Sequence, residues 1–337
     1  MNSPRELGYR WPAEWEPHRA TWLSWPHQHE TWPNHFKQAE QQFANFAHQL
    51  TRFEDIEVLV SDVSRVSAQC LAPPSDRIRH HEVETNDAWI RDYGPIFLSH
   101  PTAPPALVDF RYNAWGEKYP PYDLDQQVGE AIALLTSRHR FAINRIIEGG
   151  AIDGNGAGTI LSTRRCLLDR HRNDEFDLAA AESCLRNVLA ADHVIWLEGE
   201  IPGDDTDGHI DQIARFIASH VIVLTDLPGS NMFDENRARL LSWSARHSQS
   251  LEIVRLTAPE PQLRDQIWLP ATYANFCFVN GGLLVPTFDS PKDDVACDTL
   301  QDCFPDREIV PIPAAELIFG LGAVHCLSQQ EPRSKNE

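Results

Sequence analysis

Residues 276–286 read Phe276-Cys277-Phe278-Val279-Asn280-Gly281-Gly282-Leu283-Leu284-Val285-Pro286. Two short apolar runs flank a polar, glycine-containing turn, and this pattern predicts two strands joined as a hairpin. The sequence then predicts a helix over 291–303 and another strand over 308–312. Because strands and a helix alternate within one short stretch, the stretch favours an α/β fold.

The rest of the chain contains the same mixture of elements. Further strands are expected over 56–60, 107–110, 159–162, 194–197, 221–224 and 253–256. Apolar positions at helical spacing predict helices over 36–50, 63–72, 125–135, 175–189 and 231–248. Five of the ten tryptophans lie in the first 32 residues and predict a packed N-terminal segment. No linker divides the chain, so we expect one domain over 1–330 and a frayed tail over 331–337.

The charge of the chain restricts its partners. Its 337 residues include 49 acidic and 29 basic side chains, which gives a formal net charge of −20. This charge gives no general attraction for nucleic acid or anionic membranes, so we expect neither as a partner. Small cationic ligands fit the charge better, although excess acid also keeps a protein soluble without any other role. The sequence has no apolar run long enough for a membrane span and no apolar secretory segment at its N-terminus.

The seven cysteines are scattered along the chain and include no C-x-x-C pair. An odd, scattered set argues against a disulfide framework and against a structural zinc site. We therefore expect reduced thiols and a cytoplasmic location. Five histidines offer further metal ligands but fall in no recognised spacing, so no metal is expected; they are His18, His27, His29, His80 and His81.

One cysteine lies in a motif suited to chemistry. In Gly320-Leu321-Gly322-Ala323-Val324-His325-Cys326, glycines precede the thiol and let the backbone approach a ligand closely. Neighbouring residues of an extended chain point to opposite faces, so a base for Cys326 is expected elsewhere than at His325. The alternative is that Cys326 is an ordinary buried residue.

A second motif supplies such a base. It reads Thr206-Asp207-Gly208-His209-Ile210-Asp211. On a strand, His209 and Asp211 would share one face and turn toward the same cleft. His209 is then suited to shuttle a proton, and Asp211 to hold a cation or the imidazole. The alternative is a hydrogen-bonded pair with no catalytic role.

Two further motifs contain carboxylates beside glycines. In Asp87-Ala88-Trp89-Ile90-Arg91-Asp92-Tyr93-Gly94-Pro95, we expect Asp87 and Arg91 to pair and brace the loop. Asp92 then remains to accept hydrogen bonds from a guanidinium, and Trp89 suits the wall of a pocket for a cationic chain. In Ile147-Glu148-Gly149-Gly150, Glu148 ends a strand where backbone and ligand can approach closely, unless the motif is merely a turn.

Together these motifs resemble the agmatine deiminase family, which is similar to bacterial-type peptidylarginine deiminases and belongs to the guanidino-modifying enzymes of the pentein fold. The resemblance extends over essentially the whole chain. It runs through residues 12–22, 85–95, Asn113-Ala114-Trp115-Gly116, 148–150, 208–211 and 325–330. It implies a five-bladed, pseudo-symmetric β/α propeller, in agreement with structural units that recur at roughly 60–70 residues.

The resemblance also implies residue roles. Cys326 is implied as nucleophile and His209 as general acid and base. Glu148 is implied to orient His209, while Asp92 and Asp211 bind the guanidinium. The implied reaction, a step toward putrescine and the polyamines, converts agmatine and water to N-carbamoylputrescine and ammonia through an S-alkylthiouronium on the cysteine. No metal or organic cofactor is needed, and the cationic substrate with protonated histidine is expected to lower the pKa of the thiol.

The tail of the substrate is less well defined by the sequence. Trp89, Trp115 and Asp207 are expected to surround the second cation of agmatine. Tyr93 and the segment 117–122 depart from the family pattern, so free arginine or peptidylarginine remains an alternative substrate. The motifs also allow a guanidinium-binding protein without turnover or a metal-dependent hydrolase. The oligomeric state, a homo-oligomer included, is left open.

Overall fold

The stretch 276–312 forms the predicted arrangement. In the computed structural model, which describes residues 2–334, β15 (Cys277–Val279) and β16 (Gly282–Thr287) pair antiparallel. Helix α9 (Asp293–Cys303) then leads into β17 (Glu308–Pro313), which pairs parallel with β16. A parallel pair needs a crossover, and α9 provides it.

Three further parts of the chain repeat this order of two antiparallel strands, a helix and a parallel strand. The first contains β4 (Ile96–Leu98), β5 (Ala106–Arg111), α5 (Val128–Thr136) and β6 (Arg140–Ile146). The second contains β7 (Ile152–Gly154), β8 (Thr159–Thr163), α7 (Leu178–Leu189) and β9 (His193–Leu197). The third contains β10 (Ala214–Ala218), β11 (Val221–Asp226), α8 (Met232–His247) and β12 (Glu252–Thr257).

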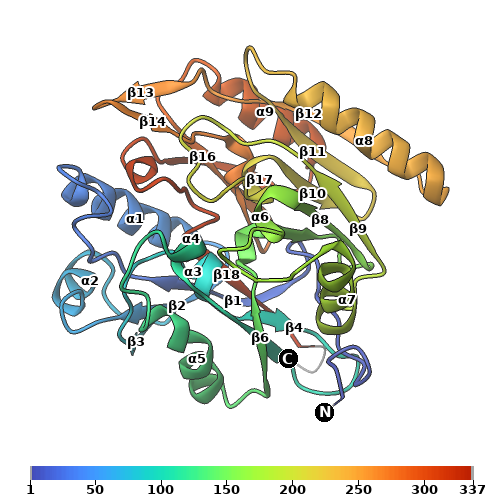
Figure 1. Cartoon of the computed structure of the whole chain (residues 1–337). Helices are drawn as coiled ribbons and strands as arrows, with labels where there is room; N and C mark the ends of the chain where they lie inside the picture. Colours follow the sequence, from blue (N-terminus) through green and yellow to red (C-terminus); the bar gives the residue numbers. More distant parts are fainter. Residues whose placement is uncertain (1, 335–337) are drawn as a thin grey trace.

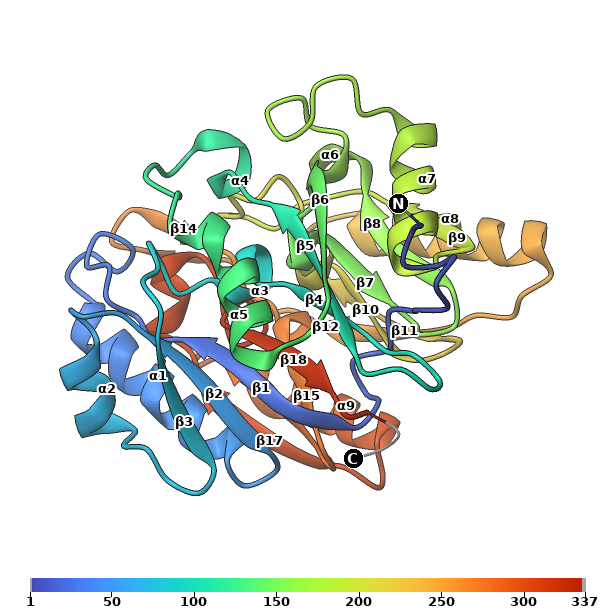
Figure 2. The ribbon, with the colours of Figure 1, turned by 90° about the horizontal axis from the view of Figure 1, so that it is seen from below.

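A fifth unit joins the two ends of the chain. Strand β18 (Ser328–Pro332) pairs antiparallel with β1 (His18–Ser24), and α1 (Phe36–Leu50) leads to β2 (Asp55–Val60), which is parallel to β1. Helix α2 (Arg65–Leu71) and β3 (Ile78–Glu82) extend this sheet. Figures 1 and 2 show β18 beside β1.

Glu331 holds this junction of the two ends. Its side chain is fully buried and accepts hydrogen bonds from Arg19, Arg138 and the indole of Trp22. The chain is thus ordered in a strand to Pro332, so the start of the predicted tail at 331 is wrong. A terminal segment is frayed only where nothing ties it down, and here an ion-pair network does so. Residues 335–337 of that tail lie outside the described residues.

The helices cover the outer faces of the sheets. In Figure 1, α1, α5, α7 and α8 lie at the periphery of the molecule. Helix α1 shows why: Ala39, Phe43, Phe46, Ala47 and Leu50 recur at helical spacing and all are buried. Trp22, Trp25 and Trp32 are also fully buried, which confirms the packed N-terminal segment. Every helix within residues 2–334 is too short or too polar to cross a membrane.

Short turns and one hairpin complete the chain between these units. The hairpin is β13 (Gln262–Arg264) with β14 (Ile267–Leu269). The turns are α3 (Ile90–Tyr93), α4 (Ala114–Glu117), α6 (Arg164–Leu167), η1 (Asp125–Gln127), η2 (Gly149–Ala151), η3 (Ile210–Gln212), η4 (Tyr273–Asn275) and η5 (Leu317–Gly320). The α/β class is therefore confirmed, and the turns carry the residues of the candidate site.

Candidate active site

A polar residue lies just before the first strand of each of the five units. Asp92 is in α3 before β4, Glu148 precedes η2 and β7, and Asp211 is in η3 before β10. Asn275 ends η4 before β15, and Cys326 precedes β18. Turn α3 contacts η2, η2 contacts η3, and η3 contacts η4. The amide of His325 donates to Asn275, so the turn before β18 joins the same series.

Gly150 shows how closely these turns approach one another. A Cβ atom added to it would lie 2.6 Å from Nδ1 of His209, 2.9 Å from Oδ1 of Asp92 and 3.1 Å from Oδ2 of Asp211. Its own amide donates to Oδ1 of Asp92 at 2.9 Å. Only glycine fits here, because three site side chains occupy the space that a Cβ needs. The site therefore brings together residues separated by more than a hundred positions.

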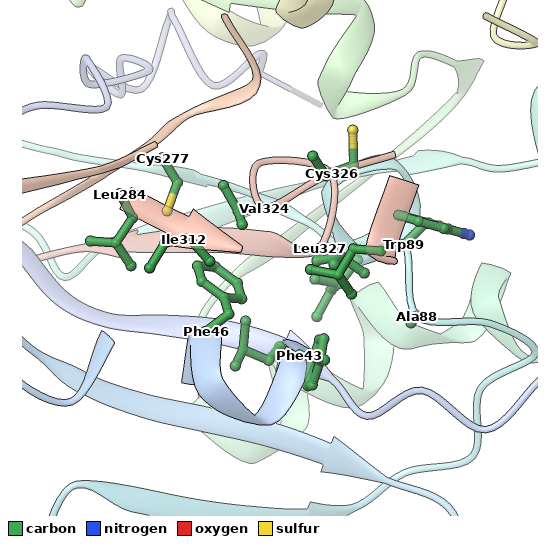
Figure 3. Packing of buried hydrophobic residues seen from close by; sticks show 14 of the residues in the cluster. Phe43, Phe46, Ala88, Trp89, Cys277, Leu284, Ile312, Val324, Cys326 and Leu327 are labelled. Atoms are coloured by element: carbon green, nitrogen blue, oxygen red, sulfur yellow. The ribbon is translucent and has the colours of Figure 1, made fainter. Parts of the chain in front are cut away.

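Cys326 lies in a buried, polar position. Cys326 is at the edge of the apolar cluster that contains Phe43 and Leu327, and its sulfur points away from those two side chains (Figure 3). Nδ2 of Asn275 donates to its sulfur at 3.1 Å, and the thiol lies 3.6 Å from Oδ2 of Asp211. Burial, followed by the charges of Asp211 and Asp92, raises the pKa of this thiol well above its usual value. The free thiol is therefore protonated at neutral pH.

Arg91 holds the segment that carries this thiol. Its Nε donates to the carbonyl of His325 at 3.2 Å, and its backbone amide donates to the carbonyl of Cys326 at 3.2 Å. The expected pair between Asp87 and Arg91 is not formed, so this interpretation is wrong. Asp87 instead accepts from the hydroxyl of Thr31 at 2.6 Å, while Arg91 is directed to the C-terminal segment.

His209 is fully buried next to a carboxylate. Its Nδ1 lies 3.7 Å from Oδ1 of Asp92. Burial acts to lower its pKa, but the negative charge of Asp92, together with Cys166 and Glu148, raises the pKa well above the usual value. The predicted strand at His209 and Asp211 is wrong: His209 precedes the short turn η3. Both side chains nevertheless reach the same place, because the turn brings them to Gly150.

Two carboxylates in the site each have one oxygen without a partner. Glu148 accepts from Nε of Arg172 at 2.7 Å through Oε1, whereas its buried Oε2 has no partner among the described residues. Asp211 accepts from His325 at 2.8 Å through Oδ2, and its buried Oδ1 has none there. Both ring nitrogens of His209 are also unpartnered in this part of the chain. The two unpartnered carboxylate oxygens suit a ligand that carries several N–H donors, since unpaired buried polar atoms are costly.

A cavity of about 380 Å³ reaches the site at Asp92 and Cys326, which are both in its lining. Trp89 and Trp115 form aromatic walls of the same cavity. The indole of Trp115 also donates to Oδ2 of Asp92 at 2.9 Å. Gly322 is required beside Trp89, because an added Cβ would lie 2.5 Å from Cζ3 of that indole. From the sequence we expect this glycine to let the backbone approach a ligand closely. In the structure, the group that approaches Gly322 is the indole ring of Trp89.

From the sequence we expect Asp207 beside the second cation of the substrate, but in the structure Asp207 is not among the residues that line the cavity. Its Oδ2 is bound by Nζ of Lys118 at 2.7 Å and by Arg172 at 2.8 Å, so two cations already neutralise it. Asp205, two residues earlier, lines the cavity instead and accepts from the hydroxyl of Tyr119 at 2.6 Å. The expectation that Asp207 faces a second cation is wrong for this geometry.

Several residues of the site were missed from the sequence. Asn275 touches both Asp211 and Cys326, and His325 bridges Asp211 to Glu14 at 2.8 and 3.0 Å. The position of Asn275 directly before the strand 276–279 was a usable signal, since the other site residues also precede strands. Glu14 lies in the stretch 12–22 that carries the resemblance, but its local pattern did not show a place in the site, because its side-chain contacts come from Arg215, Phe278 and His325, far along the chain.

Comparison with known proteins agrees with this architecture. The family model of Porphyromonas-type peptidyl-arginine deiminases matches residues 10–332. Agmatine deiminase of Pseudomonas aeruginosa strain LESB58 is 34% identical, over 98% of this chain and 97% of that protein. Agmatine deiminase of Stutzerimonas stutzeri is likewise 34% identical, over 98% of this chain and 97% of the relative.

Solved structures give the same result. A structure of the Enterococcus faecalis agmatine deiminase superposes with a TM-score of 0.94 at 29% identity, covering 99% of this chain and 98% of that chain. An amidinotransferase of Microseira wollei, only 12% identical, superposes with a TM-score of 0.55 over 96% of each chain and shares the fold alone. The chain therefore belongs to the agmatine deiminase family and matches the Porphyromonas-type peptidyl-arginine deiminases over nearly its whole length.

Proposed function

We propose that this protein is an agmatine deiminase, which hydrolyses agmatine to N-carbamoylputrescine and ammonia on the route to putrescine. The observation that carries the proposal is the arrangement around Gly150. There a thiol, an imidazole and three carboxylates from separate turns gather, with acceptor atoms of Glu148 and Asp211 left unpartnered among the described residues. A planar guanidinium offers the several N–H donors that such acceptors need.

Asp92 and Asp211 bind the guanidinium in this proposal, and Glu148 accepts from its nitrogens and positions His209. The binding of a cation also changes the thiol. Because Asp211 and Asp92 raise the pKa of Cys326, neutralising both carboxylates with substrate lowers that pKa and favours the thiolate. The nucleophile is thus activated only when substrate is present.

The thiolate of Cys326 then attacks the central carbon of the guanidinium. His209, which is an imidazolium because of its raised pKa, donates a proton to the departing nitrogen, and ammonia leaves. The covalent S-alkylthiouronium remains on the sulfur. Neutral His209 next takes a proton from water, the water oxygen bonds to the same carbon, and the carbon–sulfur bond breaks. The thiol and the ureido product are released.

The cavity favours an amine tail over a carboxylate tail. Five acidic residues line it, namely Glu30, Asp87, Asp92, Asp125 and Asp205. Among the described residues of its lining, Lys118 is the sole cationic side chain, and it is bound to Asp207. The second ammonium of agmatine finds carboxylates there, whereas the carboxylate of free arginine would find no unpaired cation.

Three substrates separate agmatine from arginine and peptidylarginine specificity. We expect ammonia release from agmatine to exceed release from free arginine and from a benzoyl-arginine peptide mimic by at least about tenfold in kcat/KM, since one lost ion pair in a buried site is worth a kcal/mol or more. Greater activity on either arginine substrate would assign the site to arginine or peptidylarginine.

For the architecture, we propose one domain over residues 1–330, in which the five units form blades about a central pseudo-fivefold axis. The repeated strand order and the contacts between successive turns support this arrangement. For the location, we propose the cytoplasm, because all seven cysteines are free, including the exposed Cys70, as expected in a reducing compartment.

A further inference from the structure

Cys166 is a second buried thiol at the back of the site, and the proposed reaction does not use it. It lies in α6 and is fully buried. Its sulfur, one ring nitrogen of His209 and one carboxylate oxygen of Glu148 all lie within 4.8 Å of one another. Three possible metal-ligand atoms, a sulfur, an imidazole nitrogen and a carboxylate oxygen, are thus close together, although their residues lie far apart in the sequence.

Hydrogen bonds from Thr163 and Arg172 hold the residues that carry these three ligand atoms in place. Oγ1 of Thr163 accepts from the amide of Cys166 and donates to the carbonyl of Gly208 at 2.6 Å, so it ties α6 to the turn that carries His209. Arg172 donates to Glu148 at 2.7 Å and to the carbonyl of Thr206 at 2.9 Å. The turns that carry the three ligand atoms are therefore fixed to one another.

Three of the atoms in this cluster nevertheless have no hydrogen-bond partner among the described residues. Oε2 of Glu148 and both ring nitrogens of His209 are buried without a hydrogen-bond partner among the described residues. Cys166 lies close enough to His209 to raise the pKa of the imidazole, but within residues 2–334 neither ring nitrogen has a well-formed hydrogen bond. Once His209 and Cys166 have lost their protons, the thiolate, imidazole and carboxylate are three buried electron-pair donors, and an electrophilic ligand can satisfy all of them.

The geometry points to a binding site for a thiophilic divalent cation, Zn²⁺ above all, formed by Glu148, Cys166 and His209 behind the substrate cavity. Thiolate, imidazole and carboxylate together favour zinc over magnesium or calcium. In tetrahedral zinc sites with bond lengths of about 2.0–2.3 Å, ligand atoms are about 3.3–3.6 Å apart, so side-chain shifts of about 1 Å close this set.

Binding has a defined proton balance. Two protons leave when the metal binds: the thiol of Cys166 loses one to solvent as its sulfur bonds to the metal, and the imidazolium of His209 loses another, because only neutral imidazole coordinates. The guanidinium of Arg172 opposes a nearby cation, whereas the carboxylates of Glu148, Asp92 and Asp211 favour it. Asp92 lines the cavity and its Oδ1 lies 3.7 Å from Nδ1 of His209, so Asp92 connects the cavity to the metal ligands.

Metal binding should inhibit the enzyme, and this consequence rests on the proposed function. A ring nitrogen of His209 that coordinates a metal cannot carry the proton that the leaving ammonia requires. Oε2 of Glu148 would be occupied as well and could not accept from the substrate. The site therefore makes deimination sensitive to free zinc, and agmatine and zinc compete.

Cobalt(II) tests the binding without any need for turnover. We expect Co²⁺ titration to give a near-ultraviolet thiolate-to-metal band in the wild type and in Cys326→Ala, and to give none in Cys166→Ala or Cys166→Ser. Cys184→Ala is the matched control, because Cys184 is half-buried on α7 away from the cluster, and it should keep the band. The serine variant preserves the size of the buried side chain and guards against misfolding of the alanine variant.

A band that persists in both Cys166 variants, or disappears in Cys326→Ala, would overturn the site. In parallel, the zinc concentration that halves ammonia release from agmatine should rise at least tenfold in Cys166→Ser, and added agmatine should weaken the cobalt band. An unchanged zinc sensitivity in that variant would also overturn the inference. A wild type that shows the band but never deiminates agmatine would instead contradict the proposed function alone.

Discussion

The sulfur of Cys326 lies 3.6 Å from Oδ2 of Asp211, and the same oxygen accepts from His325 at 2.8 Å. A carboxylate so close to a thiol opposes its ionisation. The pKa of Asp211 behaves in the opposite way: burial acts to raise it, but the hydrogen bond and charge of His325 outweigh burial and lower it. Asp211 therefore stays ionised in the free protein and keeps Cys326 protonated until a cation arrives.

Replacing this carboxylate should release the thiol. In Asp211→Asn we expect faster alkylation of Cys326 by iodoacetamide at neutral pH, by about tenfold for each unit by which the pKa falls. Turnover of agmatine should be lost in the same variant, since the proposed mechanism uses this charge to bind the guanidinium. Peptide mass spectrometry resolves Cys326 from the other six thiols.

Asp87→Asn is the control, because Asp87 lines the cavity but its hydrogen bonds go to Thr31 and Ala88. It should leave the alkylation rate of Cys326 unchanged. An Asp211→Asn protein that is alkylated no faster than the wild type would mean that this carboxylate does not set the state of the thiol.

The pH profile should report Asp92 and His209. Burial raises the pKa of Asp92, and Asp92 must be ionised to bind the cation, so kcat/KM should fall on the acid side at a pH above the usual aspartate value of about 3.9. The raised pKa of His209 should hold the alkaline limb above about 6.5, because the proposed mechanism uses the imidazolium as proton donor.

The variant Trp115→Phe tests whether Asp92 is the group that controls the acid limb of the kcat/KM profile. The indole N–H bonds to the ionised carboxylate of Asp92 and lowers its pKa, so the loss of that donor should move the limb to higher pH. A limb that stays in place or moves to lower pH would show that another group controls it. Steady-state rates of ammonia release across pH give both limbs.

The closure of the two chain ends should contribute much of the stability. Glu331 is fully buried with Arg19 and Arg138, and breaking a buried ion pair costs about 3–5 kcal/mol. We therefore expect Glu331→Gln to lower the free energy of unfolding in urea by about that amount. Glu308→Gln removes the exposed pair with Arg52 and should cost about 1 kcal/mol or less. Equal losses in the two variants would contradict a special role for the closure.

Gly322 should be required for activity rather than for folding. An alanine Cβ there would lie 2.5 Å from Trp89 and 3.1 Å from the Cβ of Cys326, so Gly322→Ala should displace one of them. A displacement of about 1 Å costs about 100-fold in rate, which we expect in kcat/KM. Gly229→Ala is the control: it strains a φ of +76° with nothing within 4 Å of the new Cβ. That variant should lose some stability and keep its activity.

Much of the secondary structure could be predicted from the sequence, because the buried elements have strong local patterns. Helix α1 begins and ends at the predicted residues 36 and 50, and β15, β16, α9 and β17 lie within a few residues of their predicted positions. These segments bury apolar faces of regular spacing. By contrast, β4 and β7 have three residues each, and only the last residue of β6 is buried, so they lack a readable period.

The site was predictable as a set of residues but not as a geometry. Asp92, Glu148, His209, Asp211 and Cys326 do converge, yet the strand expected at His209 is a turn. Local spacing cannot show such an outcome, because the conformation depends on packing against other turns. The same holds for Asp207, whose charge is neutralised by Arg172 from a different segment.

The role of Cys326 is tested most directly by comparing ammonia release and agmatine binding in the wild type and in Cys326→Ala. If Cys326 is the nucleophile, the variant should lose turnover below detection while calorimetry gives a Kd for agmatine within about tenfold of the wild-type KM, because the carboxylates that hold the guanidinium remain. Substantial ammonia release by the variant would contradict covalent catalysis at Cys326. Loss of agmatine binding in a folded variant would contradict the assignment of binding to the carboxylates.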